Sequence, residues 1–237
     1  MMKVPYSYLS EQFAKPEPIL EAIRKVVETG DFTLGASVRE FETRFAKLIG
    51  TKFAVGVGSG TDAIFLSLKA IGIGQGDEVI TAANTFVATA GAIHISGAKI
   101  VFVDCNDKYV MDVNQVTRAI TSRTKAIVPV HYAGQPVDMT ALQKIARNIP
   151  IVEDACQSID SAIDGKHCGT MGMTGAFSLH PLKNLNVWGD GGVITTNSEE
   201  IRDKLYLLRN HGMKNRDEYE IYAYNSRLDS VQAATSC

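Results

Sequence analysis

Short runs rich in valine and isoleucine alternate with longer amphipathic segments along most of this chain. Buried strands of a parallel sheet have this composition, because helices cover both of their faces. The predicted strands are the runs at 52–57, 78–83, 98–104, 125–131, 149–155, 175–180 and 192–196. The predicted helices are the segments at 17–29, 37–49, 61–71, 86–96, 113–120, 138–148 and 198–209. This order predicts an α/β fold, a mostly parallel sheet with helices on both faces.

The composition limits the kinds of protein that this chain can be. Its 237 residues are 45% hydrophobic and 21% charged, which suits one large domain or two small ones. The net charge is −2 and there is no basic tract, so no nucleic-acid partner is predicted. No apolar run approaches the ~20 residues of a membrane span. The first residues lack the apolar core of an export signal, so we expect a cytoplasmic protein.

The cysteines predict neither a disulfide framework nor a metal site. Cys105, Cys156, Cys168 and Cys237 form no CxxC pair, and we expect free thiols in a reducing compartment. His167 and Cys168 follow Cys156 closely, but this spacing fits no usual zinc pattern.

The stretch GVGSGTDA at 56–63 lies between a predicted strand and a predicted helix. Its small residues leave backbone N–H groups accessible at a helix N-terminus, where phosphate binds readily. A dinucleotide-binding loop is the competing interpretation. However, Thr61 stands where the third glycine of that loop belongs, and the next strand has no acidic residue at its end. A tight turn followed by a capped helix is the purely structural alternative.

Two charged residues follow neighbouring predicted strands. Asp154 follows IPIVE near the end of the run at 149–155, and Lys183 lies in the turn FSLHPLKNLNVWGDGG at 177–192. A buried carboxylate needs a cationic or hydrogen-bonding partner, and a protonated pyridine nitrogen is one such partner. A lysine that is partly desolvated beside another cation can form a Schiff base. The structural alternatives are that Asp154 caps a helix or pairs with an arginine, and that Lys183 is a solvated surface charge.

Seven short motifs occur here in the order in which one known family carries them. They are GSGTDA (58–63), ANTF (83–86), PVHYAGQPVDM (129–139), VEDACQS (152–158), FSLHPLKNLNVWGDGG (177–192), LRNHG (208–212) and YNSRLDSVQAA (224–234). Together they span nearly the whole chain. The sequence therefore resembles the DegT/DnrJ/EryC1/StrS family of sugar aminotransferases, which use pyridoxal 5′-phosphate (PLP) and have the aspartate-aminotransferase fold, fold type I.

The resemblance implies a role for each matching residue. Lys183 matches the lysine that holds PLP as a Schiff base, and Asp154 matches the carboxylate that pairs with the pyridinium nitrogen. Gln157 matches a residue near the phenolic oxygen of the cofactor, and Phe86 matches the aromatic ring stacked on PLP. The positions matched to the cofactor phosphate are Gly60, Thr61, Ser178 and, from the neighbouring subunit of a homodimer, Asn225.

The implied activity is the transfer of an amino group from glutamate to a keto-sugar, usually nucleotide-linked, in amino-sugar, polysaccharide or antibiotic biosynthesis. Some relatives have a histidine in place of the lysine and act in dehydration, and Lys183 argues against that branch. His131 and Tyr132 are predicted to approach the substrate. His180 is predicted either to support the site or to shape the turn, and Trp188 to pack the turn or a subunit contact.

The motifs predict one PLP-binding large domain over residues 1–237, with an N-terminal helical segment. Relatives continue for roughly a hundred residues more, about the size of a small domain, so we expect the C-terminal small domain to be absent or truncated here. A PLP-binding family member without catalytic activity is therefore the second hypothesis for the function. A nucleotide-binding Rossmann module is the third.

Overall fold

The computed structural model describes residues 4–236, and its centre is one continuous layer of strands. Four strands lie in the order β1-β9-β8-β5 and three in the order β3-β2-β4. Parallel bridges from Ile127 to Ile151 and from Val130 to Asp154 join β4 to β5 and so connect the two sets. The strands are β1 (Phe53–Val57), β2 (Glu78–Ala82), β3 (Lys99–Val103), β4 (Thr124–Val128), β5 (Val152–Asp154), β8 (Thr174–Ser178) and β9 (Gly192–Thr196).

β9 is the one strand of this layer that points in the opposite direction to the others. It pairs antiparallel with both β1 and β8, whereas β2 pairs parallel with β3 and β4, and β5 pairs parallel with β8. The mostly parallel sheet predicted from the sequence is confirmed. The carboxyl ends of the parallel strands and the first residue of β9, Gly192, therefore meet at one edge.

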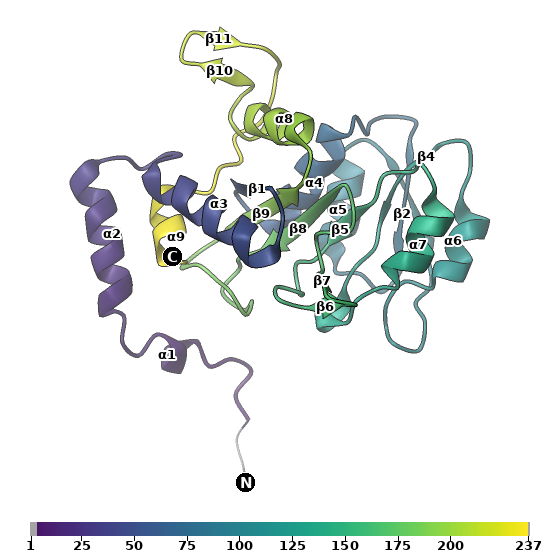
Figure 1. Ribbon diagram of the computed structural model, residues 1–237, viewed down its shortest axis with the longest axis horizontal. Helices are drawn as coiled ribbons and strands as arrows, with labels where there is room; N and C mark the ends of the chain where they lie inside the picture. The colour runs from purple at the N-terminus through teal and green to yellow at the C-terminus, as the bar shows by residue number, and fades with distance from the viewer. Residues whose placement is uncertain (1–3, 237) are drawn as a thin grey trace.

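Helices cover both faces of the sheet, because successive strand residues point to opposite sides. Val79 and Ala176 pack in a core with α4, α5 and α8, and their neighbours Ile80 and Phe177 pack on the other side, with α3, α9, α6 and α7. Figure 1 shows these helices arranged around the sheet. The helices are α3 (Ala36–Ile49), α4 (Gly60–Ala70), α5 (Val87–Ile95), α6 (Val113–Ala119), α7 (Met139–Ala146), α8 (Glu199–Arg209) and α9 (Ser230–Thr235).

Side-chain caps explain where many of these helices begin. Such a cap accepts a backbone N–H of the first helical turn, which would otherwise lack an acceptor. The caps are Ser59 of α4, Asp112 of α6, Asp138 of α7, Ser198 of α8 and Asp229 of α9.

Several short elements lie outside the sheet. The N-terminal segment contains α1 (Leu9–Gln12) and α2 (Glu17–Thr29), and α2 buries only Val26. In Figure 1 a hairpin of β10 (Met213–Asn215) and β11 (Glu218–Tyr219) projects beyond α8. A second hairpin joins β6 (Ala162–Ile163) to β7 (Lys166–His167). Among the described residues, no helix has both the length and the apolar character that crossing a membrane requires.

Candidate functional site

The sheet edge described above brings together most of the residues singled out in the sequence. Asp154 is the last residue of β5, Ser178 is the last residue of β8, and α4 begins at Gly60, just after β1. A β-carbon added at Gly60 would lie 2.7 Å from Ser178 Cβ and 2.9 Å from Cys156 Sγ. Residues from three strands therefore meet around the first turn of α4.

The first turn of α4 offers free backbone donors. The Asp62 N–H donates to Ser59 Oγ at 3.1 Å, and the Ala63 N–H donates to the Ser59 carbonyl at 2.9 Å. The N–H groups of Gly60 and Thr61 have no acceptor within residues 4–236. Because the helix dipole adds partial positive charge here, this turn suits a phosphate group. The close approach of Ser178 also explains why position 60 is a glycine.

Asp154 is buried, with 5% of its surface exposed. Thr89 Oγ1 donates to its Oδ2 at 2.6 Å, and the Cys156 N–H donates to its Oδ1 at 3.1 Å. An ion pair with an arginine, one of the structural alternatives for Asp154, is not found among residues 4–236. Each carboxylate oxygen has further acceptor capacity. A protonated ring nitrogen fits this environment as a partner.

The turn after β8 fixes the backbone of Lys183. Its N–H donates to the His180 carbonyl at 2.8 Å, and Asn186 Nδ2 donates to its carbonyl at 2.9 Å. His180 shapes the same turn, since its Nδ1 accepts the Leu182 N–H at 3.2 Å. Of the two roles predicted for His180, this contact supports the structural one.

Trp188 lies later in the same turn. Its ring meets Phe13 of the N-terminal segment edge to face, with ring centroids 5.6 Å apart. Trp188 therefore packs the turn, as predicted from the sequence.

The thiol of Cys156 connects the two charged residues. Burial raises the pKa of this thiol well above its ordinary value, the Asp154 carboxylate raises it further, and the Lys183 ammonium acts in the opposite direction. Both charges are thus close enough to act on one sulfur atom. Because its pKa is high, Cys156 stays protonated at neutral pH and is a poor nucleophile.

Two further predicted residues line the same region. The Ala133 N–H donates to Gln157 Oε1 at 2.8 Å, which fixes the side-chain amide through its oxygen and leaves the NH₂ group to donate to another acceptor. Phe86 is 66% exposed where α5 begins. The exposed aromatic ring of Phe86 suits the face of a pyridine ring. The free amide donor of Gln157 suits the phenolic oxygen of that ring.

Asn225 is exposed, one residue before Ser226, whose Oγ accepts the Gly58 N–H at 3.2 Å. Asn225 does not cap the final helix, because Asp229 Oδ1 accepts the Gln232 N–H and caps α9. A contact with the cofactor of a neighbouring subunit stays a prediction.

The prediction that His131 approaches the substrate is wrong. Its ring is completely buried, with Nε2 2.9 Å from Glu153 Oε2 and with Nδ1 accepting the Val137 N–H at 3.1 Å. The chain turns sharply after β4 in a 3₁₀ segment, Tyr132–Gly134, in which Ala133 has a positive φ of 50°. Because the chain turns here, the His131 ring lies in the interior against Glu153. Tyr132, at the start of that segment, is partly exposed.

Sequence reasoning missed the role of Glu153. Its carboxylate accepts the N–H groups of Gly169, Met171 and Gly172 in addition to its contact with His131. These bonds hold the segment before β8 against the end of β5. The signal available in the sequence was that VED, near the end of a buried run, contains the acidic residue Glu153 in addition to Asp154.

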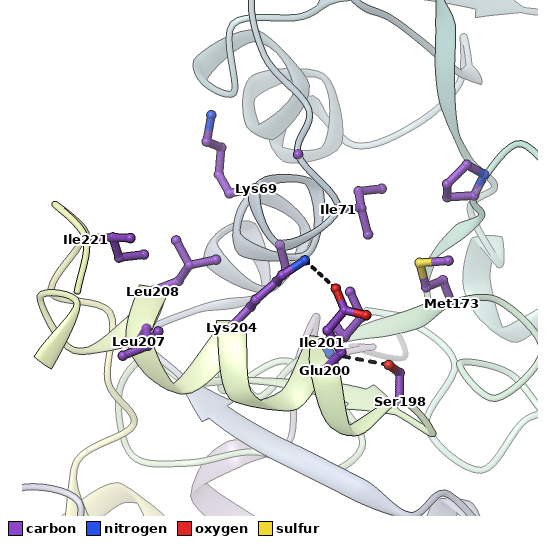
Figure 2. A pocket seen from close by; sticks show the side chains of 13 residues that line it. Lys69, Ile71, Met173, Ser198, Glu200, Ile201, Lys204, Leu207, Leu208 and Ile221 are labelled. Atoms are coloured by element: carbon purple, nitrogen blue, oxygen red, sulfur yellow. Dashed lines mark hydrogen bonds and ion pairs between the residues drawn. The ribbon is translucent and has the colours of Figure 1, made fainter. Parts of the chain in front are cut away.

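Two cavities have lysine residues in their lining. One of about 370 Å³ separates Tyr6–Gln12 from the turn at Pro181–Asn184, and Lys183 lines it. A larger one of about 620 Å³ lies between the end of α4 and α8 (Figure 2), where Lys204 pairs with Glu200. Pro150 and Met173, which precede β5 and β8, line the larger cavity. It therefore opens at the opposite end of these strands from Asp154 and Ser178, and it is not the candidate site.

The topology and this set of side chains define a domain of fold type I of the PLP enzymes. A family model described as the DegT/DnrJ/EryC1/StrS aminotransferase family matches residues 14–237. The chain belongs to this family. The interpretation of the 56–63 loop as part of a nucleotide-binding Rossmann module is therefore wrong.

Three known proteins illustrate the relationship. The dTDP-3-amino-3,4,6-trideoxy-α-D-glucose transaminase of Micromonospora megalomicea is 45% identical over 96% of this chain and 62% of its own length. A protein of Geobacillus stearothermophilus named pleiotropic regulatory protein is 44% identical over 98% of this chain and 64% of its own length. The crystal structure of NtdA from Bacillus subtilis with bound cofactor PMP has a TM-score of 0.93 and 34% identity, over 100% of this chain and 55% of NtdA. The chain thus spans less than two thirds of each protein's length.

Proposed function

We propose that this chain forms the cofactor-binding domain of a PLP-dependent aminotransferase that transfers an amino group from glutamate to a nucleotide-linked keto-sugar. The observation that carries the proposal is the meeting of Asp154, Ser178 and the free N–H groups of α4 at one edge of the sheet, where the turn that holds Lys183 follows β8. The transaminase from Micromonospora, which acts on a dTDP-linked sugar, supports this substrate class. The free thiols of Cys105, Cys156 and Cys168 agree with a cytoplasmic enzyme.

Each site residue has a distinct part in this chemistry. The first turn of α4 and the Ser178 hydroxyl bind the cofactor phosphate, and the exposed Phe86 ring supports one face of the pyridine. Asp154, buried at the end of β5, would hold the protonated ring nitrogen. Bound PLP supplies an electron sink for the Cα–H bond of the amino donor.

Lys183 has two tasks. With PLP bound, its amine would hold the cofactor covalently, and the same amine, once released, would accept the proton that leaves Cα of the amino donor. Gln157, whose oxygen accepts the Ala133 N–H, would donate from its NH₂ group to the phenolic oxygen of the cofactor. The active site is completed across a homodimer interface, where Asn225 of the second subunit contacts the phosphate.

Borohydride reduction in the presence of PLP tests the lysine assignment. We expect reduction to fix one cofactor per wild-type chain at Lys183, and Lys183→Ala to abolish that adduct. Lys166→Ala, in the exposed hairpin strand β7, is the matched control and should label like wild type. An undiminished covalent adduct in Lys183→Ala would refute the assignment.

A half-reaction with glutamate separates the two remaining hypotheses. An aminotransferase converts its bound PLP to the pyridoxamine form when glutamate is added, and the absorbance of the cofactor changes. Uptake of PLP with no such conversion would instead identify a PLP-binding family member without catalytic activity.

A further inference from the structure

A chain of hydroxyl groups reaches Asp154 from the start of α5. Thr89 Oγ1 donates to Asp154 Oδ2 at 2.6 Å, and Thr85 Oγ1 donates to Thr89 Oγ1 at 2.7 Å. Thr89 is almost completely buried, and Thr85 is partly buried. No role had been predicted for either threonine.

The direction of the chain follows from the proton count. An ionised carboxylate can only accept hydrogen bonds, and a hydroxyl has a single proton to donate. The Thr89 proton is therefore committed to Asp154, so Thr89 must accept from Thr85. Polarisation along such a chain strengthens each bond.

The two threonines also connect Asp154 to the neighbouring aromatic residue. Thr85 and Thr89 stand on either side of Phe86, and the Thr89 N–H donates to the Phe86 carbonyl at 3.0 Å. The same turn thus fixes the backbone of the exposed ring and one oxygen of the buried carboxylate. The Cys156 N–H holds the other oxygen, Oδ1.

We propose that Thr89 is a positioning residue, supported by Thr85, that fixes the orientation of the Asp154 carboxylate toward the ring nitrogen of the cofactor. Without Thr89, Oδ2 of the carboxylate loses the hydrogen bond that Thr89 donates, and the Cys156 N–H on Oδ1 is left to restrain rotation about the Cβ–Cγ bond. This inference rests on the proposed function, because Asp154 has a ring nitrogen to face only if the domain binds PLP.

The affinity for PLP, followed by the absorbance and fluorescence of the cofactor, is the first measurement. Hydrogen bonds to charged groups are strong, so we expect Thr89→Val to weaken PLP binding about tenfold. Thr89→Ser retains the donor and should bind close to wild-type affinity. Thr85→Val should have a smaller effect than Thr89→Val, because the direct bond to Asp154 persists.

Thr81→Val is the matched control. Thr81 is a fully buried threonine of β2, and its Oγ1 donates to the Val128 carbonyl at 2.8 Å rather than to a site residue. We expect it to lower thermal stability without changing PLP affinity. Equal PLP affinities of Thr89→Val and wild type would overturn the positioning role and leave the proposed function intact.

Asp154→Asn in combination with Thr89→Val decides whether Thr89 acts through Asp154. If it does, Thr89→Val weakens PLP binding far less in the Asp154→Asn background than in wild type. Additive losses would overturn the inference. If wild type takes up no PLP, the proposed function fails. Wild type, the two single variants and the double variant then test the contact between Thr89 and Asp154 by their melting temperatures. Additive decreases in melting temperature would reject the contact.

Discussion

Position 60 tolerates no side chain, because of what surrounds the first turn of α4. A β-carbon there would lie within 3 Å of both Ser178 Cβ and Cys156 Sγ. We expect Gly60→Ala to cost about 1–3 kcal/mol of unfolding free energy through overpacking. It should also weaken PLP binding about tenfold, equivalent to 1.4 kcal/mol, because Ser178 and the free N–H groups separate. Urea denaturation and PLP titration measure the two effects.

Gly74→Ala provides the matched control for this substitution. Nothing lies within 4 Å of a β-carbon built at Gly74, and its φ is not in the left-handed region. We expect it to leave both stability and PLP affinity near their wild-type values. If Gly60→Ala behaves like Gly74→Ala, the close packing around position 60 has no bearing on phosphate binding.

At the scale of single elements, the start of β2 depends on a buried carboxylate. Glu78 is 2% exposed, and hydrogen bonds from Thr121 and Arg123 hold its pKa at about 2, below the usual value of 4.5. The unfolded chain therefore binds the proton more readily than the folded one. The stability that Glu78 contributes is fully present above about pH 4.5 and is lost as the pH falls toward about 2.

We expect Glu78→Gln to lower the free energy of unfolding at neutral pH and to make its decrease between about pH 4.5 and 2 shallower than in wild type. Urea denaturation across this range measures both. Glu200→Gln is the control, because Glu200 pairs with Lys204 on the solvent side of α8 and exposed pairs contribute little. Parallel pH curves for Glu78→Gln and wild type would contradict the prediction.

The strands of the sheet were predictable because they are continuous apolar runs that are buried throughout, as in β2, β8 and β9, and the helices because they are longer amphipathic segments. The predicted strand 192–196 has the same bounds as β9, and the predicted helix 198–209 begins one residue before α8. The hairpins β6–β7 and β10–β11 were not predicted, because they have only two or three residues per strand and are mostly exposed. Such short strands leave no periodic signal in the sequence.

The positions of Asp154 and Ser178 at one sheet edge were predictable, because each residue ends a buried strand. The site was not predictable where a local turn decides the direction of a side chain. His131 follows β4 just as Asp154 ends β5, yet the positive φ of Ala133 belongs to a turn that buries the imidazole against Glu153. The contact of Thr89 with Asp154 was not predicted, because the two residues are 65 positions apart in the sequence.

At the scale of the whole molecule, the site adjoins an exposed apolar surface at the start of α5. Phe86 and Val87 are both largely exposed where α5 begins, beside Asp154 and its partner Thr89. Asn225 is exposed as well, and its amide is available to another chain. A homodimer with two shared sites follows from the proposed function, because a two-fold interface forms both sites or neither.

Mixed dimers test whether Asn225 acts across the interface. We expect Asn225→Ala homodimers to bind PLP weakly and Lys183→Ala homodimers to form no borohydride-stable adduct. A heterodimer of the two variants, isolated through different tags, should regain one intact site, because the subunit that keeps Lys183 receives Asn225 from its partner. It would then trap one PLP per dimer at wild-type affinity. If Asn225 acts within its own subunit, no site has both residues, and only weak binding would be measured.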